Sequence, residues 1–462
     1  MSDVERFDLV VIGSGPAGEK AAAQAAYFHK RVLVIERAPE PGGAAVHTGT
    51  LPSKTLRETA IYVSGKRSRH LYGVTVELDH HAKVPLLMAR KDAIAAMESR
   101  RIRDNLARHG VEYALGHARF VDAHRVAIGD RVVTGDTILI ATGSRPRRPA
   151  DIAFEDPRIH DSDEILEIEC LPESLIVLGG GVIGCEYACM FAAMDVHVTL
   201  VDTRDRILPF LDHELVDRLT QAMEHLGIGL RLGRKWGAVR RDGDTVRCDL
   251  DDGETLVASE LLFAAGRVGQ TDALDLERAG LTANARGYLD VDEAYRTAVP
   301  HILAAGDVIG FPALASASME QGRIAVCHAF DFGYKRALTP LLPYGIYTIP
   351  EVSAVGKTED ECRADGTPHV VGRAEYRENA RGCITGDLEG LTKLVVHAED
   401  RRVLGVHVIG ERASELVHIG QAVLQLGGTV DTFIDMVFNF PTLAESYKYA
   451  AYQCLGALAK RA

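Results

Sequence analysis

Glycines of the kind that let a backbone approach phosphate groups stand near the N-terminus of this sequence. Gly13, Gly15 and Gly18 follow a short apolar run in the spacing Gly-x-Gly-x-x-Gly, and an Ala-rich stretch comes next. A second apolar run ends in Glu36, eighteen residues after the last of these glycines. Glycines at a strand-to-helix turn expose amide groups to a pyrophosphate, and an acid after the next strand accepts a hydrogen bond from a ribose hydroxyl. The pattern therefore predicts a dinucleotide site.

The same arrangement occurs a second time. Gly179, Gly181 and Gly184 follow another apolar run, and Asp202 again stands eighteen residues after the last glycine. The two motifs begin at residues 13 and 179, too far apart to belong to one unit. Two units predict two bound dinucleotides.

Asp202 bears on which coenzyme the second unit takes. Its carboxylate disfavours a 2′-phosphate, which would bring further negative charge beside it, and so indicates NAD. Arg204 and Arg206 follow at once, however, and an arginine fork neutralises such a phosphate. Both arginines are equally consistent with solvated loop charges, so the sequence leaves NADP use open.

The stretch 42–54 reads GGAAVHTGTLPSK and contains no cysteine. Neither the methyl group of Ala45 nor the hydroxyl of Thr50 can form a thiolate, so thiol–disulfide exchange cannot run through this stretch. Lys54 ends it, two residues after a proline. His47 is a further candidate for chemistry, as is the distant His418, but a single histidine is more often structural.

Composition narrows the classes of protein. The chain has 462 residues, a formal net charge of −13 and 25% charged residues, which argues against a nucleic-acid or anionic-membrane partner. The opening six residues hold neither a basic cluster nor an apolar run, and no apolar segment reaches spanning length, so we expect a cytoplasmic protein. The eight cysteines are scattered; Cys185 and Cys189, one helical turn apart, suit packing better than a metal site.

Alternation of apolar runs with helical patterns around both glycine motifs predicts an α/β fold. The charged segment 55–108 has helical periodicity, and the C-terminal part has strands that alternate with helices but no third glycine motif. Expected strands are 8–12, 31–35, 174–178, 196–201, 393–397 and 403–409, and expected helices are 20–26, 185–193 and 413–426.

These motifs together resemble the flavoprotein disulfide reductases, the class I pyridine nucleotide-disulfide oxidoreductases. The corresponding family segment reads Gly-Gly-x-Cys-x4-Cys-x-Pro-Ser-Lys, and Ala45 and Thr50 stand where its redox-active cysteines would be. The family's C-terminal His-Pro-Thr-x-x-Glu is also altered, since Phe440 replaces the general base while Glu445 remains. The resemblance implies that both parts of the thiol reaction are lost together and that the hydride reaction is kept.

Within that family the chain most resembles the soluble pyridine nucleotide transhydrogenases. The residues that carry this resemblance are 49–54, 202–208, 306–312, 345–351 and 438–442. Two departures are Ala45, where that group usually keeps the first cysteine, and Phe440, where it usually has a tyrosine. Neither position is needed for hydride transfer.

The resemblance implies an architecture of two Rossmann-like dinucleotide-binding domains, the second inserted in the first, and a C-terminal α+β dimerisation domain. The implied FAD-binding domain spans 1–149 and 276–340, the NAD(P)-binding domain 150–275, and the interface domain 341–462. Lys54 and Glu186 match the family's ion pair beside the flavin, and we expect them to be the catalytic residues. The expected cofactor-binding residues are Gly13, Gly15, Pro16, Gly18, Glu36, Arg37, Gly42, Gly43, Thr50, Ala141, Thr142, Gly143, Gly179, Gly181, Val182, Gly184, Asp202, Arg204, Gly266, Arg267, Gly306, Asp307 and Ala315.

The function implied is a NAD(P) transhydrogenase of the Si-specific type, a homodimer or higher oligomer with FAD as cofactor and NAD(H) and NADP(H) as substrates. It would take a hydride from NADPH onto the flavin, release NADP, and then reduce NAD at the same site. No metal is expected. The alternatives are a diaphorase that reduces a quinone and a dimeric flavoprotein scaffold without activity.

Overall fold

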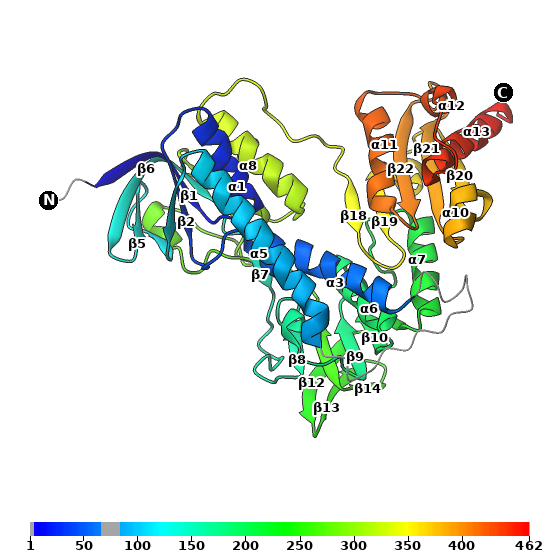
Figure 1. The fold of residues 1–462 in the computed structure, drawn as a ribbon, viewed down its shortest axis with the longest axis horizontal. Coiled ribbons are helices and arrows are strands. Elements are labelled where there is room, and N and C mark those ends of the chain that lie inside the picture. The colour runs from blue at the N-terminus through cyan, green and yellow to red at the C-terminus, as the bar shows by residue number, and fades with distance from the viewer. Residues whose placement is uncertain (1–3, 66–83, 462) are drawn as a thin grey trace.

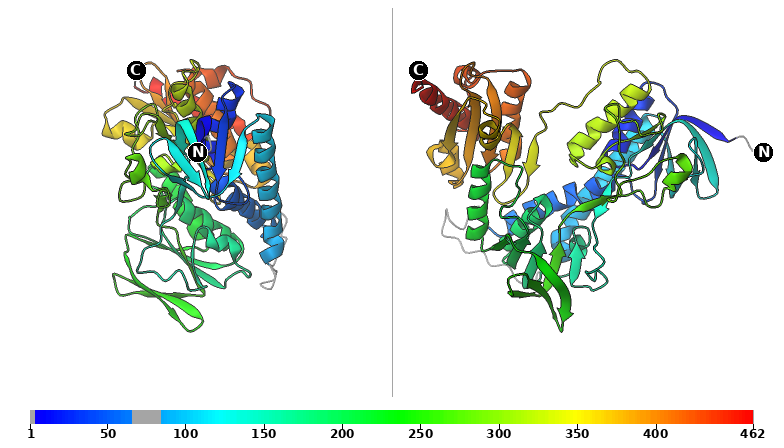
Figure 2. Two further views of the ribbon diagram at one scale, coloured as in Figure 1. Left: turned by 90° about the vertical axis from the view of Figure 1, so that its left-hand side faces the viewer. Right: turned by 180° about the vertical axis from the view of Figure 1, so that it is seen from behind.

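The computed structural model describes residues 4–65 and 84–461, which form three bodies (Figure 1). The N-terminal and C-terminal bodies lie toward opposite ends of the molecule, and the body of the second glycine motif lies beneath them, as the view from behind also shows (Figure 2). Residues 1–3 and residues 66–83 of the expected helical segment lie outside the described residues. None of the described helices has the length and apolar character that a membrane span requires.

The N-terminal body is built on a seven-stranded sheet in the order β3-β2-β1-β6-β5-β4, with β17 also paired to β6. Its central strands are almost wholly apolar because the helices α1 (Pro16–Tyr27) and α8 (Ala315–Ala329) and further chain cover them. β17 follows the second sheet in the sequence yet completes the first. The strands are β1 (Glu5–Ile12), β2 (Val32–Glu36), β3 (Glu112–Leu115), β4 (Ala118–Phe120), β5 (Arg125–Ile128), β6 (Arg131–Ile140) and β17 (Ile302–Ala304).

The second body repeats this plan with a parallel sheet in the order β11-β10-β9-β15-β8. Its helix α6 (Val182–Ala193) is buried along almost its whole length. A three-stranded antiparallel sheet, β12-β13-β14, packs against the parallel sheet. The strands are β8 (Ile159–Asp161), β9 (Ser174–Leu178), β10 (His197–Asp202), β11 (Gly229–Leu232), β12 (Trp236–Asp242), β13 (Thr245–Leu250), β14 (Thr255–Ala258) and β15 (Glu260–Phe263). A short pair, β7 (Ser144–Pro146) and β16 (Arg267–Gly269), joins the segments that enter and leave this body.

The C-terminal body is an antiparallel sheet in the order β18-β19-β22-β21-β20, with α11 (Ala413–Gln425) and α13 (Ser446–Ala459) packed in its core cluster. Its strands are β18 (Tyr344–Ile346), β19 (Val352–Gly356), β20 (His369–Glu375), β21 (Leu391–His397) and β22 (Val403–Ile409). Two long helices, α3 (Thr50–Val63) and α5 (Val84–Arg108), run beside one another between the bodies (Figure 1).

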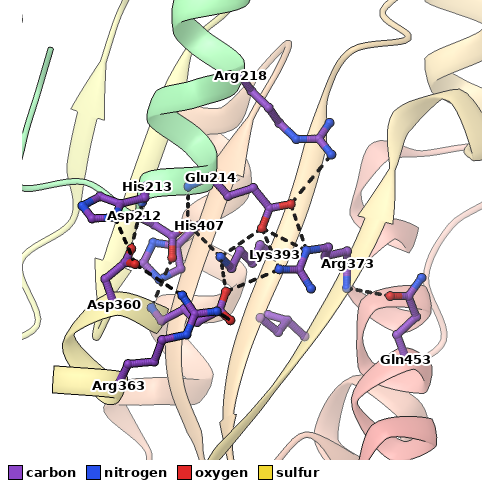
Figure 3. A network of polar contacts seen from close by, with 12 residues as sticks. Asp212, His213, Glu214, Arg218, Asp360, Arg363, Arg373, Lys393, His407 and Gln453 are labelled. Carbon is purple, nitrogen blue, oxygen red and sulfur yellow. Dashed lines mark hydrogen bonds and ion pairs between the residues drawn. The ribbon is translucent and has the colours of Figure 1, made fainter. Parts of the chain in front are cut away.

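A cluster of buried charges ties the second body to the C-terminal sheet (Figure 3). Lys393 on β21 is only 1% exposed, and its ammonium group contacts Asp212 at 2.8 Å, Glu214 at 3.0 Å and Glu359 at 2.7 Å. Arg373 on β20 adds a second cation against Glu214. Asp212 and Glu214 belong to the start of α7 (His213–His225), so this polar junction, defined by these five residues, fixes that helix against the sheet.

The expected α/β class, with two Rossmann-like units and a C-terminal α+β body, is confirmed. The strand at 174–178 has the expected bounds, and the helix expected at 185–193 begins three residues earlier, at Val182. The reason is that Gly181 is the N-cap, so the helix starts directly after the glycine turn.

Candidate functional site

A cavity of about 800 Å³ opens at the first glycine motif, within the size range of ligand pockets. Gly15 is the N-cap of α1 and brings no capping side chain, so the amides of the first helical turn face the cavity as an anion site. Predicted residues from the N-terminal body, the second body and helix α3 meet here. Those in the lining are Gly13, Gly15, Pro16, Glu36, Arg37, Gly43, Thr50, Lys54, Ala141, Thr142, Gly143, Val182, Glu186, Arg267, Gly306, Asp307 and Ala315.

The remaining predicted residues do not line this cavity. Gly18 and Gly42 support it from behind: a side chain at Gly18 would collide with the carbonyl oxygen of Gly13, and one at Gly42 with Val46. The others belong to the second unit and its exit turn, and they are Gly179, Gly181, Gly184, Asp202, Arg204 and Gly266.

Glu36 joins the end of β2 to the glycine turn. Its Oε2 accepts hydrogen bonds from the backbone N–H of Ser14 at 2.9 Å and from the Ser14 hydroxyl at 2.7 Å. Its Oε1 accepts from the backbone N–H of Ala38 at 2.9 Å. All three donors are neutral groups, and the Glu36 side chain lines the cavity.

Several features fit an FAD molecule in this cavity. Gly13 has φ of +104°, and a side chain there would meet the carbonyl oxygen of Ala141, so only glycine keeps this wall close and open. The Thr142 hydroxyl is buried and has no hydrogen-bond partner among the described residues. Asp307 accepts from the Ser144 hydroxyl at 3.0 Å. A bound dinucleotide would fit against the glycine wall and would supply hydrogen-bond partners to the helix terminus and to the buried hydroxyl.

Lys54 and Glu186 meet in the cavity from different bodies. Lys54, on α3, places its Nζ 2.7 Å from Oε2 of Glu186, on α6. Glu186 is 4% exposed and Lys54 26%, so the acid is fixed while the cation still faces the open space. The backbone N–H of Tyr347 donates to the other oxygen of Glu186 at 2.9 Å, and the Tyr347 ring centre lies 4.8 Å from the ammonium. The predicted ion pair is formed, and its catalytic role stays a prediction.

The stretch 42–54 folds as the short helix α2 (Gly43–His47) and the start of α3, and it places Ala45 and Thr50 in the lining. No cysteine occurs among the described residues of that lining, and no disulfide joins the cysteines of the described chain. Cys185 and Cys189 are fully buried, and no cluster of described residues could hold a metal ion. Both cysteines lie in the hydrophobic core around α6, and the packing role stays a prediction.

The histidines that the sequence singled out have structural contacts. His47 Nε2 lies 3.0 Å from the carbonyl oxygen of Pro41, and His418 Nδ1 lies 2.8 Å from Oε1 of Gln421. Both rings nevertheless line the cavity. Phe440 is 74% exposed and does not line it. No general base therefore occupies the place that Phe440 takes.

The second unit holds its acid differently. Asp202 ends β10, and its Oδ1 accepts from the backbone N–H of Arg204 at 2.8 Å and from its Nε at 2.9 Å. Its Oδ2 accepts from Nη2 of Arg204 at 2.8 Å and from the backbone N–H of Gly180. Burial opposes the charge of Asp202, but these donors outweigh it and lower its pKa. The sequence offered a phosphate ligand or a solvated charge for Arg204; in the structure it pairs with Asp202, and its role toward a phosphate stays a prediction.

Sequence reasoning missed three residues of the site. Ser14 had a signal, since it lies inside the first glycine motif beside the acid it binds. Tyr347 lies within a segment that carried the family resemblance, but nothing there indicated its contacts. Asp163 also lines the cavity; burial raises the pKa of its carboxyl, opposed by Arg267 at 3.9 Å.

Comparison with known proteins gives two family matches. Residues 7–322 match the family model described as pyridine nucleotide-disulphide oxidoreductase, and residues 342–451 match the dimerisation domain of the same family. Proteins named soluble pyridine nucleotide transhydrogenase are similar over nearly the full length. That of Mycobacterium tuberculosis is 46% identical over 97% of both chains, and that of Colwellia psychrerythraea 41% identical over 98% of both.

Solved structures agree with this match. The crystal structure of LpdA from Mycobacterium tuberculosis has a TM-score of 0.88 at 31% identity and covers 97% of this chain and 99% of its own. The HOCl-induced flavoprotein disulfide reductase RclA from Escherichia coli, as its Cu(II) complex, also has a TM-score of 0.88, at 26% identity, with 97% and 99% covered.

Proposed function

Because the chain belongs to the pyridine nucleotide-disulphide oxidoreductase family, we propose that it is an FAD enzyme that transfers a hydride between NADPH and NAD. The observation that carries this function is the Lys54–Glu186 pair, which faces a cavity whose described lining holds no sulfur. The site keeps what a hydride transfer needs and lacks what a disulfide reduction needs.

The residues of the cavity have separate tasks. Gly13, Gly15 and the N-terminus of α1 would hold the pyrophosphate of FAD, and Asp307 and Thr142 would offer it further hydrogen-bond partners. Bound FAD would supply a ring that takes up a hydride from one nicotinamide and gives it to another.

Lys54 supplies positive charge at this place. Its ammonium is fixed by Glu186, which the Tyr347 amide holds in turn, so the charge is oriented before any substrate binds. A preorganised cation stabilises the negative charge that develops as the hydride arrives. No proton has to be exchanged with a thiol, which agrees with Ala45 and Phe440, neither of which can exchange a proton, in the places of the family's first cysteine and general base.

We further propose the division into domains at 1–149, 150–275, 276–340 and 341–462, and a homodimer formed through the segment that matches the dimerisation domain. Assembly beyond a dimer and transfer of the Si-specific type also remain predictions. A cytoplasmic location is supported by eight cysteines without a disulfide in the described chain, since a reducing compartment keeps thiols in this state.

The test measures reduction of thio-NAD by NADPH with flavin-loaded protein. The unchanged enzyme should turn over, and Lys54→Met should lose roughly a hundred- to a thousandfold in rate, because one preorganised charge is removed. Lys357→Met is the matched control, since Lys357 also pairs with an acid, Asp365 at 2.6 Å, but on the surface of the C-terminal body. A flavin-loaded enzyme that leaves thio-NAD unreduced would refute the function, and faster reduction of a quinone than of thio-NAD would identify a diaphorase.

A further inference from the structure

The proposed function, on which this inference rests, requires one nucleotide site to accept two coenzymes that differ by a 2′-phosphate. The acid that meets the ribose in such units is Asp202. Its surroundings show how a site can serve both forms.

Asp202 has its acceptor positions filled. A carboxylate offers about four lone-pair sites, and Asp202 accepts four hydrogen bonds, three from Arg204 and one from Gly180. Two of the four come from the Arg204 guanidinium, and the other two come from backbone amides. A ribose hydroxyl can therefore donate to Asp202 only if the guanidinium gives up one of its hydrogen bonds and so frees an acceptor position on the carboxylate.

Arg204 is the partner with room to move. Its side chain is 45% exposed whereas that of Asp202 is 5% exposed. It stands in the irregular segment directly after β10, at the surface. A guanidinium carries five N–H donors, and the two that Asp202 takes leave three for another acceptor.

We propose that Arg204 determines the dual coenzyme specificity by exchanging between Asp202 and the 2′-phosphate. When NAD binds, its ribose hydroxyl replaces the guanidinium at Asp202. When NADP binds, the guanidinium turns toward the phosphate and screens it from the carboxylate. The same pair thus accepts either form, whereas an aspartate alone would repel the phosphate.

Arg206 does not share this role. Its guanidinium lies 2.5 Å from Asp217 on α7, so its charge is paired with a different acid from that of Arg204. It is 44% exposed, close to the value for Arg204, and therefore gives a control of matched charge and exposure.

The experiment measures binding of two fragments that carry no nicotinamide, 5′-AMP and 2′,5′-ADP, to the FAD-loaded holoenzyme by titration calorimetry. Arg204→Gln should lower the affinity for 2′,5′-ADP by roughly ten- to a hundredfold, the range of a charge-assisted hydrogen bond, and should not lower the affinity for 5′-AMP. Arg206→Gln should keep the ratio of the two affinities. Asp202→Asn should act in the opposite direction, weakening 5′-AMP and strengthening 2′,5′-ADP.

Equal loss of both fragments in Arg204→Gln, or the selective loss in Arg206→Gln, would overturn the inference. The outcome is separable from the proposed function because neither fragment transfers a hydride. If the unchanged enzyme transfers hydride but Arg204→Gln leaves the ratio of the 5′-AMP and 2′,5′-ADP affinities as it was, only the inference is refuted. If Arg204→Gln changes that ratio as expected but the unchanged enzyme transfers no hydride, only the proposed function is refuted.

Discussion

The first and second dinucleotide units share a frame but hold their acids in different ways. In both, a glycine N-caps a helix of twelve residues, and a later glycine packs that helix onto the turn. Glu36 is held by neutral donors from Ser14 and Ala38. Asp202 is held by a guanidinium and two amides. The first acid is ready to receive a ribose, and the second must exchange a partner first.

The surroundings of the two units also differ, because the first is enclosed and the second is more open. The first lines a cavity that residues from the second and C-terminal bodies help to close. The glycines of the second lie outside that cavity, while its α7 is fixed by the polar junction to the C-terminal sheet. Under the proposed function, one motif would serve two tasks: the first unit would enclose FAD, and the second would present an accessible, firmly placed site for the nicotinamide coenzymes.

The largest effect should come from the polar junction that anchors the second unit. Lys393→Met removes the cation shared by Asp212, Glu214 and Glu359 and leaves the fully buried Asp212 without it. We expect the free energy of unfolding to fall by about 3–5 kcal/mol, the range for breaking a buried ion pair. Urea unfolding of the holoenzyme measures it.

Lys357→Met is again the control, because its pair is exposed to solvent and contributes little to stability. If the two variants lost the same stability, the junction would not anchor the second unit, and this part of the comparison would be wrong.

The next effect concerns the glycine that packs the helix onto the turn in both dinucleotide units. A Cβ atom at Gly18 would collide with the carbonyl oxygen of Gly13, and one at Gly184 with that of Gly179. Gly18→Ala and Gly184→Ala should each cost about 3 kcal/mol, since backbone must shift to admit a methyl group. Gly181→Ala should change thermal unfolding little, because its Cβ would meet no atom within 4 Å. Unequal costs at Gly18 and Gly184 would show that the shared frame is not equally tight.

How far the sequence predicted these features depends on the distance over which each interaction acts. The spacing of Gly13, Gly18 and Glu36 defined the first unit because glycine turns and apolar strands are local properties. The Lys54–Glu186 pair spans 132 residues and was predicted only through the family resemblance.

Other contacts could be predicted neither from a local sequence pattern nor from the family resemblance. The bond of Lys393 to Asp212 joins residues 181 apart, and no local pattern marks either side chain as a partner. Arg204 and Asp202 are two residues apart, yet the sequence left their relation open. Whether an exposed arginine turns back onto an acid depends on the fold around the carboxylate, which here also places the Gly180 amide.

A smaller effect should appear as the pH is lowered. Burial opposes the charge of Glu214, but Arg373 and Lys393 outweigh it, so its pKa lies below the usual value. A lowered pKa gives stability that is present above the unfolded-state value of about 4.3 and is lost as pH falls through the folded-state value. The difference in stability between the unchanged protein and Lys393→Met should therefore be full above about pH 5 and shrink in more acid solution. Unfolding midpoints across this range measure it, and a difference that grew with acidity would have the wrong sign.

The smallest effect tests the contrast between the two acids directly. Ser14 occupies the place in the first unit that Gly180 occupies in the second, and its buried hydroxyl donates to Glu36 and accepts from the Gly42 amide at 3.2 Å. Ser14→Ala should cost about 1 kcal/mol of stability and speed the release of FAD modestly, because Glu36 keeps its two backbone donors. Thermal unfolding and the recovery of flavin fluorescence on release measure the two effects. If FAD were released as slowly as before, the backbone alone would fix Glu36, and the units would differ only in the arginine that holds Asp202.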